Sequence, residues 1–198
     1  MLRADHVDFD TAEIYDQKTT LACTAFSFFT LLSEYVQQEH GLKLEFNILK
    51  EFDEMEKVRG KKKRVWWLFN HCKTVGFKAK SGELVKIKGY RPLTQKRNFK
   101  KLSTTIQQSG PLVFAVHRYK GHKLNPKDTD IVEPVEPSMK KKNVGHAMMV
   151  RGFDYPGRLI KFQNSWGDNS IKWMPLAVWQ DIIKYAFYIE GGTIISNK

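Results

Sequence analysis

The chain has 198 residues, of which 41% are hydrophobic and 13% aromatic, enough to fill the core of one domain or of two small lobes. No apolar run approaches the roughly 20 residues of a membrane-spanning helix, which argues against a membrane protein. The formal net charge of +12 brings nucleic acids into consideration as partners. However, the lysine-rich runs at 61–64, 96–101 and 140–142 have no accompanying nucleic-acid motif. We interpret them as solvated loops that lie far apart on a basic surface, with an acidic partner as the alternative.

The first half of the chain reads as mainly helical. After a brief strand at 7–9, apolar residues at helical spacing predict a central helix over 24–38, for which Gly41 is a suitable C-terminal stop. The same periodicity predicts helices over 44–57 and from 65 to Gly76.

The second half is richer in strands. We expect a short helix over 102–108, with Ser103 as its cap, and a long loop over 121–143. A second helix is expected to begin near Pro175. The predicted strands cover 84–87, 112–116, 147–153, 159–163 and 185–189, the third and fourth being joined by a turn at 154–157. A helical half followed by a strand-rich half indicates an α+β fold. We expect a single domain over 1–198, with a helical lobe at about 17–80 and a β-rich lobe at about 81–198.

Cys23 is the strongest candidate for a reactive side chain. It stands immediately before the apolar run of the central helix, so it is expected at a helix N-terminus. The helix dipole and the free N–H groups at that end favour a thiolate over a thiol. Gln17, six residues upstream, could bring an amide donor back beside the sulfur. This pattern is typical of a nucleophilic cysteine with an oxyanion donor.

His146 and Asn164 could complete such a site. His146 stands at the start of one predicted strand, and Asn164 follows the next strand along the chain. Because antiparallel neighbours place the start of one strand beside the end of the other, the two side chains are expected within hydrogen-bonding reach. The histidine would take the thiol proton and the asparagine would orient its ring. Trp166 could shield their hydrogen bond from water.

The remaining cysteine and histidines point to no metal site. Cys72 lies on a predicted helix, and His71, His117 and His122 offer no convincing ligand spacing. We therefore expect no metal and no cofactor. With two cysteines and an N-terminal start that turns charged before an apolar segment develops, the sequence favours a reducing, intracellular (cytoplasmic) location without a signal peptide.

Three motifs in this order resemble those of the papain-like cysteine peptidases. They are Tyr15-Asp16-Gln17 with Cys23-Thr24-Ala25-Phe26-Ser27, Gly145-His146-Ala147, and Asn164-Ser165-Trp166-Gly167. Thr24 differs from the tryptophan usual in plant and lysosomal members and is similar to the prokaryotic and viral-type members. The interval from Cys23 to His146 is 123 residues (146 − 23), slightly shorter than the roughly 130–150 typical of the family.

The resemblance implies a papain-like fold of two lobes, helical and β-barrel-like, with the active site in the cleft between them. It implies Cys23 as the nucleophile, His146 as the general base and acid, Asn164 as the orienting residue and Gln17 as the oxyanion-hole side chain. The residues 18–22 depart from the family's glycine-containing run before the nucleophile.

By the same resemblance, four residues are candidates for substrate binding: Lys63, Ala115, Ala147 and Trp166. Lys63 stands where the family has a glycine that pairs with the substrate backbone, which suggests a bias towards acidic peptides. Ala115 and Ala147 match positions near the main specificity pocket.

The leading interpretation is a thiol peptidase that acts on peptide or protein substrates as a monomer, without a membrane and without nucleic acid as its main partner. One alternative is a catalytically weak papain-fold module whose basic surface binds an acidic protein or a nucleic acid. A second alternative is an isopeptidase or acyltransferase with the same triad.

Overall fold

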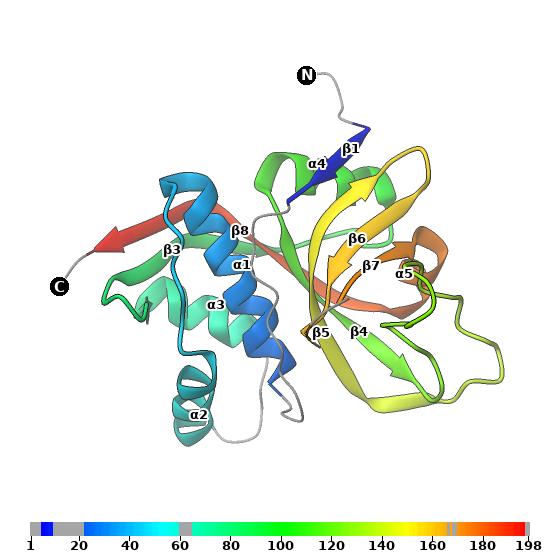
Figure 1. The fold of residues 1–198 in the computed structure, drawn as a ribbon, viewed down its shortest axis with the longest axis horizontal. Helices are drawn as coiled ribbons and strands as arrows, with labels where there is room; N and C mark the ends of the chain where they lie inside the picture. The colour runs from blue at the N-terminus through cyan, green and yellow to red at the C-terminus, as the bar shows by residue number, and fades with distance from the viewer. Residues whose placement is uncertain (1–4, 10–21, 60–64, 166, 168–169, 197–198) are drawn as a thin grey trace.

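A computed structural model describes residues 5–9, 22–59, 65–165, 167 and 170–196 of the chain. Within these ranges the chain forms helices beside one large antiparallel sheet (Figure 1). The helices are α1 (Cys23–His40), α2 (Ile48–Arg59), α3 (Val65–Thr74), α4 (Phe99–Ser109) and α5 (Leu176–Ile182). The strands are β1 (His6–Asp8), β2 (Phe77–Lys78), β3 (Leu84–Pro92), β4 (Leu112–Tyr119), β5 (Lys141–Asp154), β6 (Leu159–Gln163), β7 (Ile171–Pro175) and β8 (Ile183–Ser196).

The sheet carries the predicted hairpin, β5 and β6, towards one end, between β4 and the terminal strand β7. Its strand order is β2-β3-β8-β4-β5-β6-β7, and β1 pairs with β5. The predicted α+β class is therefore confirmed, and so is the antiparallel pairing of β5 with β6 across the turn after Asp154.

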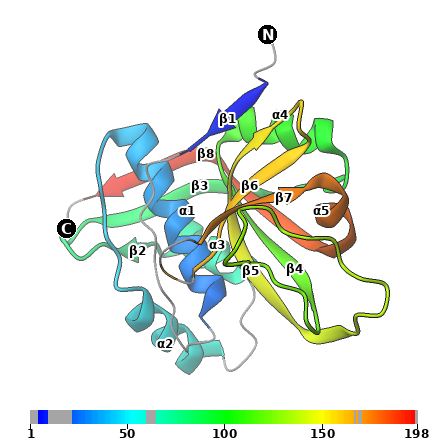
Figure 2. The same cartoon turned by 45° about the vertical axis from the view of Figure 1, so that its right-hand side comes forward.

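Helix α1 is buried on most of its circumference, as its long apolar sequence without Gly or Pro predicts. It ends as predicted: Gly41 adopts a left-handed conformation with φ of 68°, and its N–H donates to the carbonyl of Gln37. The helix packs against β5, and in Figures 1 and 2 its dark-blue N-terminal end lies beside that strand.

Two hydrophobic cores lie on opposite faces of the central strands. The first joins helices α1, α2 and α3 to the sheet, and its aromatic centre includes Phe28, whose ring meets that of Phe69 edge-on at 5.0 Å. The second lies between the sheet and helices α4 and α5. Adjacent residues of β5 divide between them, Met149 facing the first core and Met148 the second. The central strands contribute residues to both cores, so the cores do not mark a lobe boundary near residue 80. That boundary stays a prediction.

The structure corrects several predicted element boundaries. Helix α4 begins three residues before the predicted start, with Asn98 as its N-cap, whose side chain accepts from the N–H of Lys101. Ser103 lies inside the helix, and its hydroxyl donates back to the carbonyl of Lys100. Strand β7 was not predicted, and β8 runs from Ile183 to Ser196, well beyond the predicted 185–189.

No helix in the described parts of the chain is long and apolar enough to cross a membrane.

Candidate active site

Cys23 is the first residue of α1, where the sequence pattern placed it. The first N–H groups of a helix have no acceptor within it, and the positive end of the helix dipole lies there. Here Ala22 provides no side-chain cap, and the first turn contains no acidic residue that would offset the positive end. The thiol is partly exposed and packs against the first core, which also contains Ala147, the residue after His146.

His146 and Asn164 meet as predicted. His146 lies on β5 with 4% of its surface exposed, and Asn164, which directly follows β6, is 1% exposed. His146 Nε2 and Asn164 Oδ1 are 2.7 Å apart, a short hydrogen bond. The antiparallel β5–β6 pair brings these residues together although 18 positions separate them in sequence.

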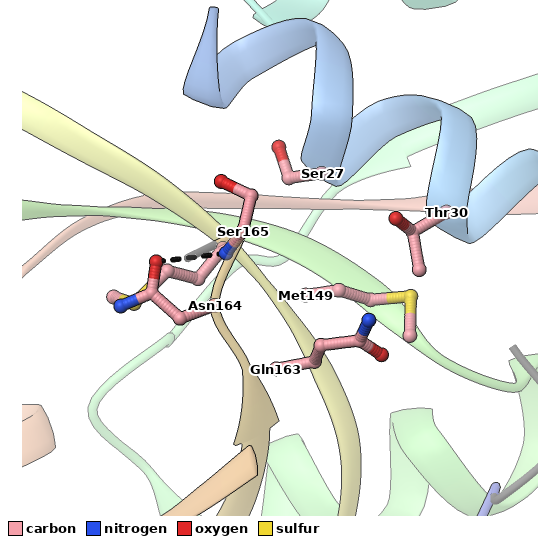
Figure 3. Close-up of a pocket in the computed structure, with 7 residues that line it drawn as sticks. Ser27, Thr30, Met149, Gln163, Asn164 and Ser165 are labelled. Carbon is pink, nitrogen blue, oxygen red and sulfur yellow. Dashed lines mark hydrogen bonds between the residues drawn. The ribbon is translucent and has the colours of Figure 1, made fainter. Parts of the chain in front are cut away.

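A third group determines which ring nitrogen of His146 carries the proton. The backbone N–H of Ser165 also donates to Asn164 Oδ1, at 2.9 Å (Figure 3). A backbone N–H can only donate, so the shared atom is the amide oxygen, an acceptor. His146 Nε2 must therefore donate, and in the neutral ring Nδ1 is the nitrogen that carries the basic lone pair. The sequence analysis did not assign this role to Ser165, although an Asn-Ser pair after a strand is a known signal for such a turn.

Burial lowers the pKa of His146 to about 4. The hydrogen bond that His146 donates to Asn164 raises this pKa, and the positive charge of Arg118 lowers it. At neutral pH the imidazole is therefore uncharged and able to accept a proton. Sequence reasoning missed Arg118, because only the pairing of β4 with β5 brings it near the histidine.

The second cysteine is chemically different from the first. Cys72 lies on α3 with none of its surface exposed, and its thiol is 3.8 Å from the carbonyl oxygen of Val85. Burial raises the pKa of Cys72 to about 12, although a backbone hydrogen bond and the charge of Lys86 act in the opposite direction. This thiol stays protonated and shielded.

A small cavity of about 10 Å³ lies behind Asn164, where α1 meets β5 and β6. Figure 3 shows Ser27 and Thr30 from α1 on one side of it, and Gln163 and Ser165 on the other. This volume suits a single water molecule, and the polar lining could hydrogen-bond one. The helix that begins with Cys23 is thus packed tightly against the strands that hold the histidine and the asparagine.

The other predicted site residues divide into two groups. Ala115 on β4 and Ala147 on β5 are directly opposite each other in the sheet, and both are buried. Gln17, Lys63 and Trp166 lie outside the described residues. Among the described residues, no three His, Cys, Asp or Glu side chains gather as metal ligands would.

The interpretation of the basic runs as loops far apart needs correction. Lys141 and Lys142 belong to β5, and Lys100 and Lys101 belong to α4. The second and third runs are also not far apart, because Lys96 and Arg97 of the second run and Lys141 of the third all lower the pKa of His117.

No known family's sequence model matches the chain, and neither does any curated protein. Solved structures do match. Xylellain, a cysteine protease from Xylella fastidiosa, is 16% identical with a TM-score of 0.80, over 96% of this chain and 87% of that one. A cysteine protease of Carica candamarcensis in complex with E-64 is 13% identical with a TM-score of 0.72, over 94% and 99%. Procathepsin L 3 of Tenebrio molitor larval midgut is 14% identical with a TM-score of 0.70, over 96% and 70%.

The fold is therefore the fold of papain-like cysteine proteases, as the sequence motifs predicted.

Proposed function

We propose that this chain is a thiol-dependent peptidase that hydrolyses peptide bonds through Cys23, His146 and Asn164. The observation that carries the proposal is the buried hydrogen bond of 2.7 Å between His146 and Asn164. The acceptor in this bond is the amide oxygen of Asn164, because the Ser165 N–H donates to the same atom. It leaves Nδ1 of a neutral imidazole as the base, in a fold whose solved relatives are cysteine proteases. The motif Cys23-Thr24-Ala25 is similar to that of the prokaryotic and viral-type members, and on this ground we place the chain closer to them.

In the proposed reaction, Cys23 Sγ attacks the carbonyl carbon of the peptide bond while its proton passes to His146. The carbonyl oxygen becomes an oxyanion, for which the backbone N–H of Cys23 and the side chain of Gln17 are the proposed donors. When the C–N bond breaks, His146 gives its proton to the departing amine and a thioester remains. Water then attacks the thioester, again with proton transfer to His146, and releases the carboxylate and the thiol.

The substrates proposed are peptides or proteins, because a papain-like site accepts an extended chain. Ala115 and Ala147, whose small side chains belong to residues directly opposite each other in the sheet, stay predicted to line a pocket for an apolar substrate side chain. Lys63 and Trp166 stay predicted contributors to binding.

Labelling with a thiol-directed epoxide tests the proposal directly. We expect one covalent adduct on the native protein, located at Cys23 by peptide mass analysis. Cys72 is expected to stay unmodified, because it is fully buried and its pKa is raised to about 12. The Cys72→Ala variant should label like the wild type. If native protein under reducing conditions gains no adduct, or if Cys23→Ala labels equally, the peptidase proposal is wrong.

A further inference from the structure

Most of the excess positive charge comes from one stretch of sequence. Between Glu83 and Asp128 there is no acidic residue. The same stretch contains eleven cationic residues, which are Lys86, Lys88, Arg91, Lys96, Arg97, Lys100, Lys101, Arg118, Lys120, Lys123 and Lys127. The charge of the chain is therefore strongly asymmetric along its sequence.

Folding gathers part of this charge, together with two lysines from outside the stretch, around one histidine. Burial and four positive charges lower the pKa of His117, which lies on β4. These charges belong to Lys141, Lys184, Lys96 and Arg97, which we call the basic cluster. They come from separate elements: Lys141 opens β5, Lys184 lies near the start of β8, and the other two precede α4.

Hydrogen bonds hold the loop of the basic cluster in place. Trp179 Nε1 on α5 donates to the carbonyl of Lys96 at 2.6 Å, and Gln180 Nε2 donates to the carbonyl of Arg97 at 2.7 Å. Lys96 Nζ in turn donates to the carbonyl of Lys184. The positive charges are thus presented from a fixed backbone.

The charges of the basic cluster are not paired with carboxylates of the described residues. In the described part of the chain, none of its four side chains forms an ion pair with a carboxylate. Arg97, Lys141 and Lys184 are exposed, and Lys96 is half-buried. Uncompensated charges of one sign at one place attract an anionic group and increase its rate of association.

The strand register connects the basic cluster to the candidate active site. His117, at the centre of the cluster, lies directly opposite Gly145, and the neighbouring pair is Val116 with His146. Consecutive pairs along a strand are about 3.3 Å apart. One further step leads to Ala115 and Ala147. The cluster and the candidate active site thus occupy the same end of the β4–β5 pair.

We propose that the basic cluster binds acidic side chains of the substrate, so that the enzyme prefers peptides with aspartate or glutamate near the bond that it cleaves. This inference rests on the proposed function, because the proposed active site determines where the cleaved bond lies. Peptide carboxylates are favoured over nucleic-acid phosphates because, in the strand register, His117 lies one pair from His146 and two pairs from the paired alanines, where the proposed peptide substrate would bind. Lys141 on β5 and Lys184 on β8 supply positive charges that attract the substrate carboxylates.

A binding experiment tests the preference without requiring turnover. The Cys23→Ala protein is titrated into a fluorescent peptide containing Asp and Glu, and into the same peptide with Asn and Gln, with anisotropy as the readout. We expect the acidic peptide to bind about tenfold more tightly at low salt, since two or more exposed pairs each contribute a few-fold. Raising the salt concentration should reduce the difference by screening.

Matched charge reversals locate the effect. The double variant Lys141→Glu with Lys184→Glu should abolish the preference for the acidic peptide. The control variant, Lys43→Glu with Lys88→Glu, makes the same change in net charge at exposed positions far from the site. Lys43 follows the C-terminal end of α1, and Lys88 lies against Gly191, seven residues along β8 from Lys184. This control should retain the preference. Three results would each overturn the inference. The first is equal binding of the two peptides, and the second is an equal loss of preference in both double variants. The third is tighter binding of an oligonucleotide than of the acidic peptide, if only Lys141→Glu with Lys184→Glu (the cluster variant) loses it.

Kinetics on the native protein separate this inference from the proposed function. For the acidic peptide, kcat/KM should fall about tenfold in the cluster variant, while the neutral peptide changes less than about threefold. A wild type that labels at Cys23 and cleaves both peptides equally would contradict the acidic preference alone. A protein that does not label but still binds the acidic peptide selectively would contradict the peptidase proposal alone.

Discussion

Replacing Cys23 with alanine is expected to lower kcat/KM for peptide hydrolysis by roughly 10⁴-fold to 10⁶-fold, as removal of a catalytic nucleophile does in other hydrolases. The physical reason is that the substitution removes the sulfur atom that would form the covalent intermediate. Folding should hardly change, because Cys23 is only partly buried and alanine is a good helix former. The measurement is steady-state hydrolysis of a fluorogenic peptide, with thermal unfolding of both proteins alongside.

Cys72→Ala is the matched control, since it removes the other thiol of the chain. It should destabilise the protein by about 1 kcal/mol, because it leaves a small void in the first core. Its kcat should match the wild type after correction for folded protein. Activity that survives in Cys23→Ala but is lost in folded Cys72→Ala would reverse the assignment of the two thiols.

Asn164→Ala is expected to lower kcat by about 10²-fold with little change in KM, an effect typical of a group that orients a catalytic side chain. The substitution removes the oxygen that accepts from both His146 Nε2 and the Ser165 N–H. The histidine ring would then lose its fixed plane and tautomer. Kinetics at saturating and limiting substrate separate the two parameters.

The pH profile distinguishes this positioning role from a merely structural one. The bond to Asn164 raises the pKa of His146 against the effect of burial, so its loss lowers that pKa. Because the neutral imidazole is the proposed base, activity is expected to rise with pH through the pKa of His146, and the acid limb of kcat/KM should move to lower pH in Asn164→Ala. Asn164→Asp keeps both acceptor bonds and adds a negative charge, so its acid limb should move to higher pH with partial rescue of kcat. The exchange breaks no hydrogen bond of Asn164 Nδ2, which has no partner among the described residues. An acid limb that stays unchanged in both variants would show that Asn164 does not act through His146.

The central parts of the site could be predicted because they depend on local patterns. An apolar run with helical spacing and Gly41 at its end are sufficient to place Cys23 at the start of α1. A turn between two short apolar runs is sufficient to place Asn164 beside His146. Each inference needs only the residues within one element or one hairpin.

Features that depend on distant segments were not predictable in this way. Strand β7 contains Lys172, which is fully buried, and a lysine in the middle of a run argues against a buried strand. Its ammonium group is satisfied by the carbonyl of Thr129 at 3.1 Å and by Asp130 at 2.9 Å, both from a loop more than 40 residues away. Strand β8 was predicted too short, because Gly191 and Gly192 resemble a stop, although the chain passes through both with positive φ and continues to pair with β3.

The basic cluster near the candidate site could not be predicted from the sequence for the same reason. The runs around Lys96 and Lys141 are distant in sequence, and each alone reads as a solvated surface segment. Only the order of the sheet, in which β4 lies between β5 and β8, brings their charges around His117, whose pair with Gly145 is next to the pair of Val116 with His146. Long-range strand pairing is not encoded in the composition of either run.

Trapping the acyl-enzyme tests the central claim, nucleophilic catalysis by Cys23, most directly. The wild type is mixed with an activated peptide ester and quenched in acid within the first turnover, and the intact mass and the modified peptide are determined. We predict a mass increase equal to the acyl group, on the peptide that contains Cys23, and no increase in Cys23→Ala. Hydrolysis of the ester without an acylated protein, or acylation of a residue other than Cys23, would contradict the account.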